Sequence, residues 1–239
     1  MDDWKQRTEL LLGGVGVDAL SRSRVLVVGV GGVGAYAVEM LARAGVGHLD
    51  IVDGDKVGVS NINRQLPALH SSVGQPKVEV MRRRIADINP DAEVKAFDVF
   101  ITENSVVGLL DDGNYDFVVD AIDSVAPKVA LIRHCLSGGI KIVSSMGAGG
   151  RVDASKVRYA DIWETYNDGL AKAVRTRLKA GGLRKRLPVV WSEEVPEKAS
   201  VMLTDEIANK RSSYGTVSYL PAIFGCMLGA YVIRKLTGK

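Results

Sequence analysis

The sequence predicts an α/β protein with a Rossmann-like, doubly wound and mainly parallel sheet. Two observations support this fold class. Short apolar segments alternate with helical patterns through residues 1–150, as in consecutive βαβ units. A glycine-rich turn directly follows the first apolar segment and opens the next helix. We expect residues 1–150 to form the core with an N-terminal arm, and residues 151–239 to form a C-terminal lobe integrated with it.

Two strands and a helix begin the core. Residues 24–30 form a continuous apolar run, typical of a parallel strand that is buried on both faces. Residues 33–45 place apolar side chains at helical spacing and end at Gly45, a common helix C-cap. Residues 48–52 are expected to form the second strand.

The same alternation predicts the rest of the core. Because parallel strands are joined by right-handed crossovers, each further strand should follow a helix that covers the sheet. The expected elements are, in order, a helix near 76–88, a strand near 94–97, a helix near 103–110, a strand near 117–121, a helix near 125–136 and a strand near 140–144.

The pattern changes after residue 150. Residues 169–180 form a cation-rich helix with one apolar face, and short strands are expected near 188–191 and 201–203. Residues 218–236 form an apolar helix with about 16 uncharged residues, fewer than the roughly 20 that span a bilayer. We expect this helix to pack inside the protein or at a dimer interface, with membrane contact as the alternative.

The composition limits the class of protein. The chain begins MDDWKQRTELL, which lacks the basic, apolar and small-residue order of a secretory signal, so we expect a cytoplasmic protein. Cys135 and Cys226 lie in apolar helical segments and form no CxxC pair. Neither structural zinc nor a disulfide is therefore expected.

The positive charge is concentrated in one segment. Residues 172–186 carry seven cations and no acid, and without them the net charge of the chain falls from +3 to −4. Such a cluster indicates a surface that binds a polyanion such as RNA, although a solvated helix face is the simpler alternative. The cations are Lys172, Arg175, Arg177, Lys179, Arg184, Lys185 and Arg186.

The glycine-rich turn predicts a phosphate-binding site. Its GxGxxG spacing lies between a strand and a helix, so backbone N–H groups and the helix dipole can face a phosphate. Asp53 ends the second strand, where its carboxylate can bind ribose hydroxyls or simply form a turn with Gly54. NAD-dependent enzymes share both features, so these residues predict the fold but not the reaction. The turn contains Gly29, Gly31, Gly32 and Gly34.

Three charged residues beyond this turn indicate chemistry at phosphorus. Arg64 follows the second strand, where its guanidinium can bridge phosphate oxygens or remain solvated. Lys77 stands at a helix start, after Pro76 at the first helical position; the helix dipole disfavours a cation there, so an anion is expected nearby. Asp123 follows the fourth strand and can hold Mg²⁺ on a triphosphate or cap the next helix. This set is suited to attack at the phosphorus of ATP.

The chain resembles the ubiquitin-activating-enzyme superfamily of adenylating proteins. Five motifs occur in the expected order and near the expected spacing: GVGGVG, DGDKV, SNINRQ, VGQPK and DAIDS. The resemblance implies ATP and Mg²⁺ as cofactors, and a homodimer in which Arg7 enters the partner subunit's site. It implies catalytic roles for Arg7, Arg64, Lys77 and Asp123. It assigns ATP contacts to the four glycines and to Asp53, Asp55, Asn61, Arg64, Gln65, Lys77 and Asp123.

Within this superfamily, the chain resembles the tRNA threonylcarbamoyladenosine dehydratases. This resemblance rests on the basic helix and on four segments: DINP, GAGG, VVWSEEVP and GTVSYLPA. It implies that the basic segment binds tRNA. It also implies adenylation of the threonyl carboxylate of a modified adenosine beside the anticodon, followed by ring closure with loss of water. Some members carry a cysteine where this chain has Ser212 and Ser213. Because the ureido group of the same nucleotide can attack the acyl-adenylate, the reaction needs no enzyme thioester.

Two other hypotheses remain. The chain could adenylate a small ubiquitin-like sulfur-carrier protein, in which case that protein or a cysteine desulfurase would be a partner. It could also be a regulatory subunit that binds nucleotide without turnover. The full set of Arg64, Lys77 and Asp123 argues against the regulatory hypothesis.

Overall fold

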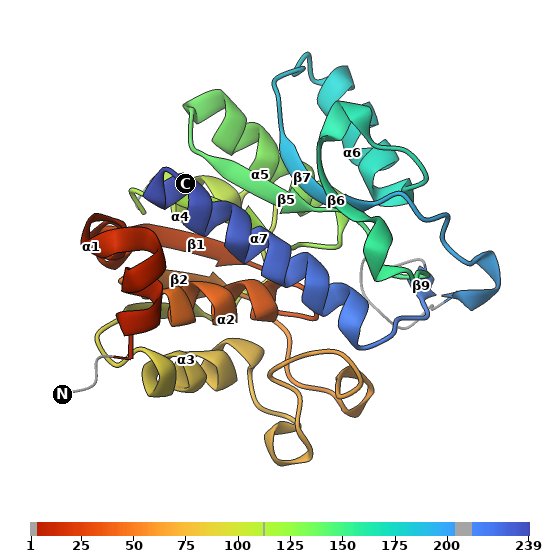
Figure 1. Cartoon of the computed structure of the whole chain (residues 1–239). Helices are drawn as coiled ribbons and strands as arrows, with labels where there is room; N and C mark the ends of the chain where they lie inside the picture. The colour runs from red at the N-terminus through yellow and green to blue at the C-terminus, as the bar shows by residue number, and fades with distance from the viewer. Residues whose placement is uncertain (1–3, 112, 204–211) are drawn as a thin grey trace.

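The computed structural model describes residues 4–111, 113–203 and 212–239, which form three layers with a twisted sheet between two layers of helices (Figure 1). The strands of the sheet lie in the order β3-β2-β1-β4-β5-β7-β6. All neighbouring pairs run parallel except β7 and β6. The strands are β1 (Arg24–Val28), β2 (His48–Val52), β3 (Glu93–Phe97), β4 (Phe117–Asp120), β5 (Ile142–Ser145), β6 (Val157–Asp161) and β7 (Pro188–Ser192).

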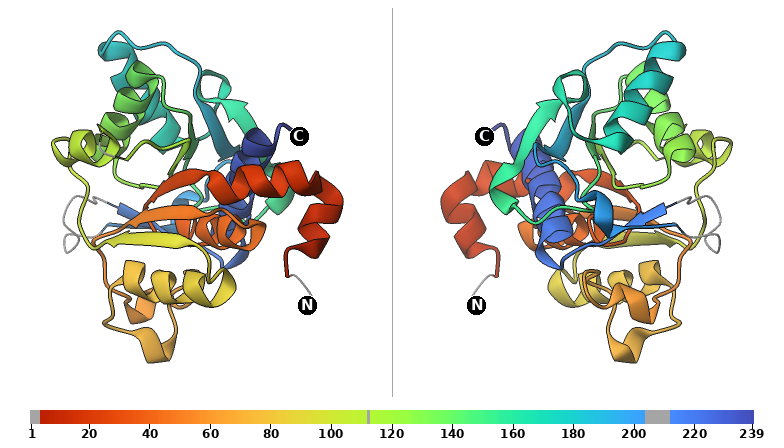
Figure 2. Two further views of the ribbon diagram at one scale, coloured as in Figure 1. Left: turned by 90° about the vertical axis from the view of Figure 1, so that its left-hand side faces the viewer. Right: turned by 90° about the vertical axis from the view of Figure 1, so that its right-hand side faces the viewer.

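The helices divide the apolar core into two halves. On one face α1, α2, α3 and α7 pack against the sheet, and on the other face α4, α5 and α6 do so (Figure 2). Strands buried on both faces explain why β1 and β4 read as continuous apolar runs. The helices are α1 (Gln6–Arg22), α2 (Gly34–Ala44), α3 (Lys77–Ile88), α4 (Ser105–Asp111), α5 (Val125–Gly138), α6 (Gly169–Ala180) and α7 (Tyr219–Thr237).

The fold class predicted from the sequence is confirmed, and the predicted core elements agree with the structure to within two residues at each end. The sheet nevertheless extends further than expected. β7 pairs with β5 and β6 pairs with β7, so the sheet crosses residue 150 into the segment expected to form a C-terminal lobe. β8 (Val201–Leu203) and β9 (Ser212–Tyr214) form a separate two-stranded sheet.

The apolar helix α7 packs on α2 inside the protein. A Cβ at Gly225 would lie 2.2 Å from the carbonyl oxygen of Val33, and a Cβ at Gly229 would lie 2.7 Å from Cβ of Met40. These two glycines therefore let the helices approach closely. By length and composition α7 could also cross a membrane. Its Leu220, Phe224, Leu228 and Val232 are fully buried in the core, as the packing prediction requires.

Helix α1 lies at the end of the sheet where the strands begin. Lys5, just before α1, lies 3.9 Å from Asp91, which precedes β3, and Leu20 accepts a hydrogen bond from Gly47, which precedes β2. Figure 1 accordingly shows α1 at the left, while the arrowheads of β1 and β2 point to the right. The helix is kinked at Gly13, where φ is 75°.

Candidate adenylation site

The glycine turn brings the backbone of α2 close to the ends of two strands. A Cβ at Gly34 would lie 1.7 Å from the carbonyl oxygen of Gly29. Gly29 itself has a φ of 89°, and a Cβ there would lie 2.7 Å from the carbonyl oxygen of Ala121. Both positions therefore require glycine. The N-terminus of α2 is thus held at the carboxyl edge of the sheet, between β1 and β4.

Asp53 joins the end of β2 to the glycine turn. Its Oδ2 accepts a hydrogen bond from Val30 N at 2.7 Å, and its Oδ1 accepts one from Asp55 N at 2.8 Å. The carboxylate thus forms a local turn, which was the alternative to ribose binding, yet each of its oxygens keeps a lone pair for a ribose hydroxyl. Burial raises the pKa of Asp53, and the positive charge of Lys77 opposes that shift.

Lys77 begins α3 and is 4% exposed. Pro76 was expected at the first helical position, but it lies just before the helix, as its N-cap. The Nζ of Lys77 donates a hydrogen bond to Asp55 Oδ2 at 2.8 Å. Asp55 therefore supplies an anion of the kind that the sequence predicted near this cation. Because an ammonium group has three donors, Lys77 can also bind a phosphate.

The loop after β2 folds over the glycine turn. Asn61 shapes it, because its Oδ1 accepts a hydrogen bond from Gly58 N and its carbonyl accepts from Arg64 N and Gln65 N. The amide of Gln65 lies beside Gly31, and its Oε1 is buried without a hydrogen-bond partner in the described part of the chain. A buried acceptor without a partner is costly, so its position favours a bound ligand at this turn.

Arg64 lies across the glycine turn. Its stem packs beside Gly32, and its guanidinium donates hydrogen bonds to the carbonyl oxygen of Ser60 at 3.0 Å and to Asn63 Oδ1 at 2.8 Å. Burial lowers the pKa of Arg64, and the negative charge of Asp123 opposes that shift. The loops after β2 and β4 therefore bring opposite charges together beside the N-terminus of α2.

Asp123 is exposed at the same edge of the sheet. The N-cap position of α5 belongs to Ser124, so capping does not account for Asp123. No cluster of three or more metal-ligating side chains occurs among the described residues. Mg²⁺ commonly takes one or two carboxylates, substrate phosphates and waters, so a single Asp123 beside a triphosphate fits a metal that arrives with the nucleotide.

A buried ion pair below Asp123 was missed in the sequence. Asp120 and Lys128 are both fully buried, and Lys128 Nζ lies 2.9 Å from Asp120 Oδ2. Lys128 shares a helix face with Leu131, Ile132 and Cys135, which are buried. That i, i+3, i+4, i+7 spacing was a usable signal, because a lysine on an apolar face needs a partner.

A second missed network supports the GAGG segment after β5. Arg151 is 4% exposed and donates hydrogen bonds to carbonyl oxygens of Gly147, Glu194 and Asn167. Asp168 caps α6 by accepting from Ala171 N, and also accepts from Gly147 N. The start of the basic helix is therefore tied to the carboxyl edge of the sheet.

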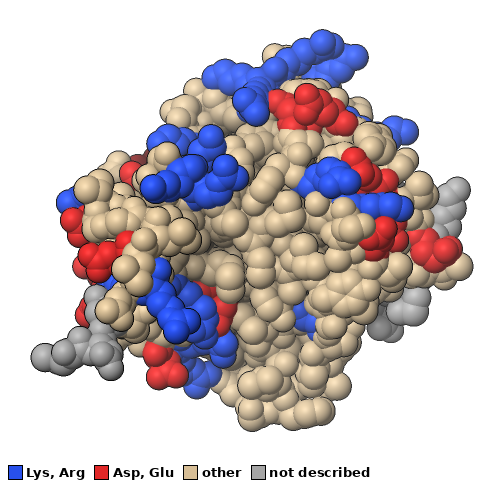
Figure 3. Space-filling model, in the orientation of Figure 1, with Lys and Arg blue, Asp and Glu red and all other residues tan. Residues whose placement is uncertain are grey.

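The seven predicted RNA-binding cations do not have equal roles. Arg175 is half-buried and donates to Ile162 O and to Thr165 Oγ1, so it stabilises the fold. Lys185 donates to Leu136 O at 2.7 Å, and Arg186 lies 3.8 Å from Asp161. Lys and Arg side chains gather at the top of Figure 3, over α6 and the segment after it. The exposed cations that remain are Lys172, Arg177, Lys179 and Arg184.

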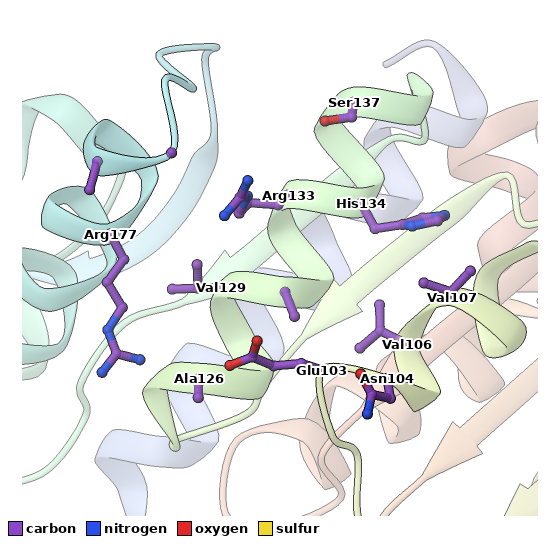
Figure 4. A pocket seen from close by; sticks show the side chains of 13 residues that line it. Glu103, Asn104, Val106, Val107, Ala126, Val129, Arg133, His134, Ser137 and Arg177 are labelled. Carbon is purple, nitrogen blue, oxygen red and sulfur yellow. The ribbon is translucent and has the colours of Figure 1, made fainter.

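A groove of about 950 Å³ lies between α4, α5 and α6. Arg133 of α5, Arg177 of α6 and Glu103, just before α4, line it (Figure 4). Arg133 lies against Gly181 at the end of α6. It therefore adds a cation from α5 to the basic surface that the sequence assigned to residues 172–186.

Arg7 and the cysteines lie apart from this site. Arg7 is exposed in α1, at the opposite edge of the sheet, so its own nucleotide site is out of reach. Burial raises the pKa of the Cys135 thiol to about 12 and also raises the pKa of Cys226. Both thiols are therefore poor nucleophiles at neutral pH. The side chains of Ser212 and Ser213 lie outside the described residues.

The model of the ThiF family matches residues 6–239. The chain belongs to the ThiF family. Among ThiF-family relatives, the tRNA threonylcarbamoyladenosine dehydratase of Bacillus subtilis is 41% identical over 237 residues, covering 96% of this chain and 93% of the relative. The Escherichia coli enzyme of that name is 36% identical over 258 residues, and the match covers 100% of this chain and 96% of the E. coli enzyme.

Solved structures agree with these relatives. The structure of the E. coli tRNA N6-threonylcarbamoyladenosine dehydratase in complex with ATP has a TM-score of 0.90 and 35% sequence identity to this chain. The match covers 100% of this chain and 96% of the E. coli chain. The molybdopterin-synthase adenylyltransferase of E. coli, by contrast, is 36% identical over 154 residues, or 64% of this chain. The family resemblance found in the sequence is confirmed, and the dehydratases of B. subtilis and E. coli match 96–100% of the chain at 35–41% identity.

Proposed function

We propose that this protein is an ATP-dependent, adenylate-forming enzyme that converts threonylcarbamoyladenosine in tRNA to its cyclic form. One observation carries the proposal: the likeness to the dehydratases spans 96–100% of the chain, whereas the likeness to the E. coli molybdopterin-synthase adenylyltransferase covers 64% of it. Three residues would perform the adenylation: Arg64 and Asp123 in the loops after β2 and β4, where their opposite charges interact, and Lys77 at the start of α3.

ATP would bind with its phosphates over the glycine turn and its ribose near Asp53. Lys77 and Arg64 would neutralise charge on the phosphates, and the threonyl carboxylate would attack the α-phosphorus. Pyrophosphate leaves and an acyl-adenylate forms. Asp123 would hold Mg²⁺, which supplies further charge neutralisation when bound. The donors of this site therefore act by positioning and electrostatics.

Ring closure follows from geometry within the substrate. The ureido group of the same nucleotide attacks the activated carbonyl carbon and expels AMP, with net loss of water. Well-oriented intramolecular attack can lower the barrier by about 7–11 kcal/mol, so no enzyme nucleophile is needed. The raised pKa values of Cys135 and Cys226 are consistent with this route.

The surface around α6 would bind tRNA through its phosphates. Its start is tied to the GAGG segment by Asp168, so RNA held on α6 lies beside the carboxyl edge of the sheet. We assign the contacts to the exposed cations of α6 and the segment after it, with Arg133 added and Arg175 removed. Binding to phosphates is salt-sensitive, and the modified base would supply specificity.

A homodimer would complete the site. Arg7 lies at the edge of the sheet opposite its own nucleotide site. We infer that it contacts the nucleotide bound to a second copy of the chain. Leu10, Leu11 and Val15 of α1 are 82%, 78% and 84% exposed. They give α1 an apolar face that no other part of the described chain covers. We infer that this face packs on the partner subunit. The proposed site of action is the cytoplasm, where its tRNA substrate is found.

Incubation with ATP, Mg²⁺ and threonylcarbamoylated tRNA tests the function. The nucleoside released by digestion should lose the mass of one water, and omission of ATP should abolish the change. Activation of a sulfur-carrier protein is the competing result: pyrophosphate exchange would then require that protein and be indifferent to tRNA.

A further inference from the structure

A fully buried pair of opposite charges lies directly beneath the turn that carries Asp123. Asp120 ends β4 and Lys128 lies in the second turn of α5, and both are 0% exposed. Three short contacts converge on Asp120 and Lys128. Lys128 Nζ lies 2.9 Å from Asp120 Oδ2, Ser144 Oγ donates to that same oxygen at 2.6 Å, and Lys128 Nζ also donates to Ile122 O at 2.8 Å.

This network fixes both backbone groups of Ile122. Its carbonyl accepts from Lys128, and its N–H donates to Asp120 Oδ1 at 3.1 Å. The preceding residue, Ala121, donates from its N–H to Val28 O at 2.8 Å and lies against Gly29, where no Cβ could fit. The turn between β4 and α5 is therefore held in place against the glycine turn. Asp123 is the residue that follows Ile122 in this turn.

Stability is a weak explanation for these charges. Replacing a buried ion pair with apolar residues of similar volume is often neutral or stabilising, because the cost of burying two charges can equal or exceed the gain from their attraction. A pair that binds both backbone groups of one turn residue has a geometric effect that an apolar pair lacks. In this chain the turn leads directly to a residue of the proposed adenylation site.

We propose that Lys128 and Asp120 are positioning residues that hold the Asp123 turn against the glycine turn. The inference rests on the proposed adenylation, and neither side chain touches a substrate. Lys128→Met removes the contact to Ile122 O. Because a misplacement of about 1 Å can cost about 100-fold in rate, we expect kcat for tRNA-dependent pyrophosphate release to fall by about 100-fold. The amide of Ile122 should exchange faster with solvent, since its turn loses a restraint.

A double variant separates positioning from stability. Lys128→Met alone leaves the Asp120 carboxylate buried without its cation, so a lower Tm is expected. Asp120→Asn with Lys128→Met removes both charges and should recover the Tm, while Ile122 O still lacks its donor. We expect kcat to stay low and Ile122 exchange to stay fast in this double variant.

Arg84→Met provides a matched control. Arg84 pairs with the buried carboxylate of Glu39 at 2.7 Å, and this pair joins α3 to α2 without contacting the Asp123 turn. Its loss should lower Tm and leave kcat unchanged. Recovery of both Tm and kcat in the double variant, or unchanged Ile122 exchange in Lys128→Met, would overturn the inference. If wild-type protein releases no pyrophosphate with the tRNA, the proposed function fails, whereas Ile122 exchange still tests the positioning role.

Discussion

Lys77 Nζ and Asp55 Oδ2 lie 2.8 Å apart, and this contact joins the start of α3 to the loop after β2. The lysine is almost fully buried, while the Asp55 side chain is 55% exposed. A cation at a helix N-terminus is unfavourable alone, and Asp55 offsets it. The pair thus holds the Lys77 side chain in place before the nucleotide binds.

Lys77→Met should therefore impair the chemical step more than the fold. Removal of a cation that stabilises charge on the phosphates should lower kcat for adenylation roughly 100- to 1000-fold, as for the loss of an oxyanion-hole donor. Single-turnover pyrophosphate release measures the effect. Lys56→Met is the control, because Lys56 is an exposed cation two residues after Gly54 and should retain nearly full activity. Equal losses in both variants would contradict a specific role for Lys77.

Arg7 is expected to act on the partner subunit. Arg7→Ala and Lys77→Ala should each be inactive, and a mixture of the two should recover activity, because hybrid dimers contain one site with both residues intact. Subunit exchange is demonstrated separately by mass spectrometry of tagged chains. Arg22→Ala, in the last turn of the same helix, is the control and should remain active alone. No recovery despite demonstrated exchange would mean that Arg7 does not complete the partner's site.

The basic surface should control affinity for tRNA but not for ATP. Replacing Lys179 and Arg184 with glutamate should weaken tRNA binding and flatten its dependence on salt, by about 0.7–0.9 in the log–log slope for each lost phosphate contact. Filter binding at several salt concentrations gives both quantities. Lys95 and Arg82, replaced in the same way, provide a control of equal charge change on exposed positions away from α6. Identical salt slopes in the two double variants would place the RNA elsewhere.

Glu39 gives the fold a defined dependence on pH. Burial alone would raise its pKa, but hydrogen bonds and charge from Arg84 and Arg43 outweigh burial and lower it from its ordinary value of 4.5. A carboxylate with a lowered pKa stabilises the fold above its ordinary pKa, and that stability is lost as the pH falls through the folded value. Glu39→Gln should cost about 1 kcal/mol at pH 7, or roughly 2–4 °C in Tm.

This Tm deficit should shrink as the pH falls from 4.5 through the lower folded pKa, because the carboxylate is protonated first in the unfolded chain and then in the folded protein. Calorimetry of both proteins from neutral to acid pH measures it. A Tm deficit that stays constant with pH would show that Glu39 stabilises the fold through packing rather than through its charge.

The sequence predicted elements whose signals are local. The bounds of α2 follow from the glycine turn before it and from Gly45, which takes the left-handed conformation with φ of 90°. β6 was missed because it lies at the sheet edge, where side chains alternate weakly and its core contact is mainly Val157. No short-range pattern reveals that β7 inserts between β5 and β6.

The site could be predicted only in part for the same reason. Motif order predicted Arg64, Lys77 and Asp123 as site residues, because each follows a strand or opens a helix. The sequence predicted an anion near Lys77 but not that Asp55 supplies one, because Asp55 lies 22 residues earlier in the chain. Likewise, Arg175 belongs to the same charge run as Arg177, but its contacts with the turn after β6 depend on tertiary packing.

Transfer of oxygen from the substrate carboxylate to AMP tests the central claim most directly. Threonylcarbamoylated tRNA labelled with oxygen-18 in the threonyl carboxylate is incubated with the protein, ATP and Mg²⁺, and the nucleotide products are analysed by mass spectrometry. Attack at the α-phosphorus predicts one labelled oxygen in AMP, formed in equal amount with the cyclic nucleoside, and unlabelled pyrophosphate. Label in inorganic phosphate with formation of ADP, or cyclisation without labelled AMP, would contradict adenylation.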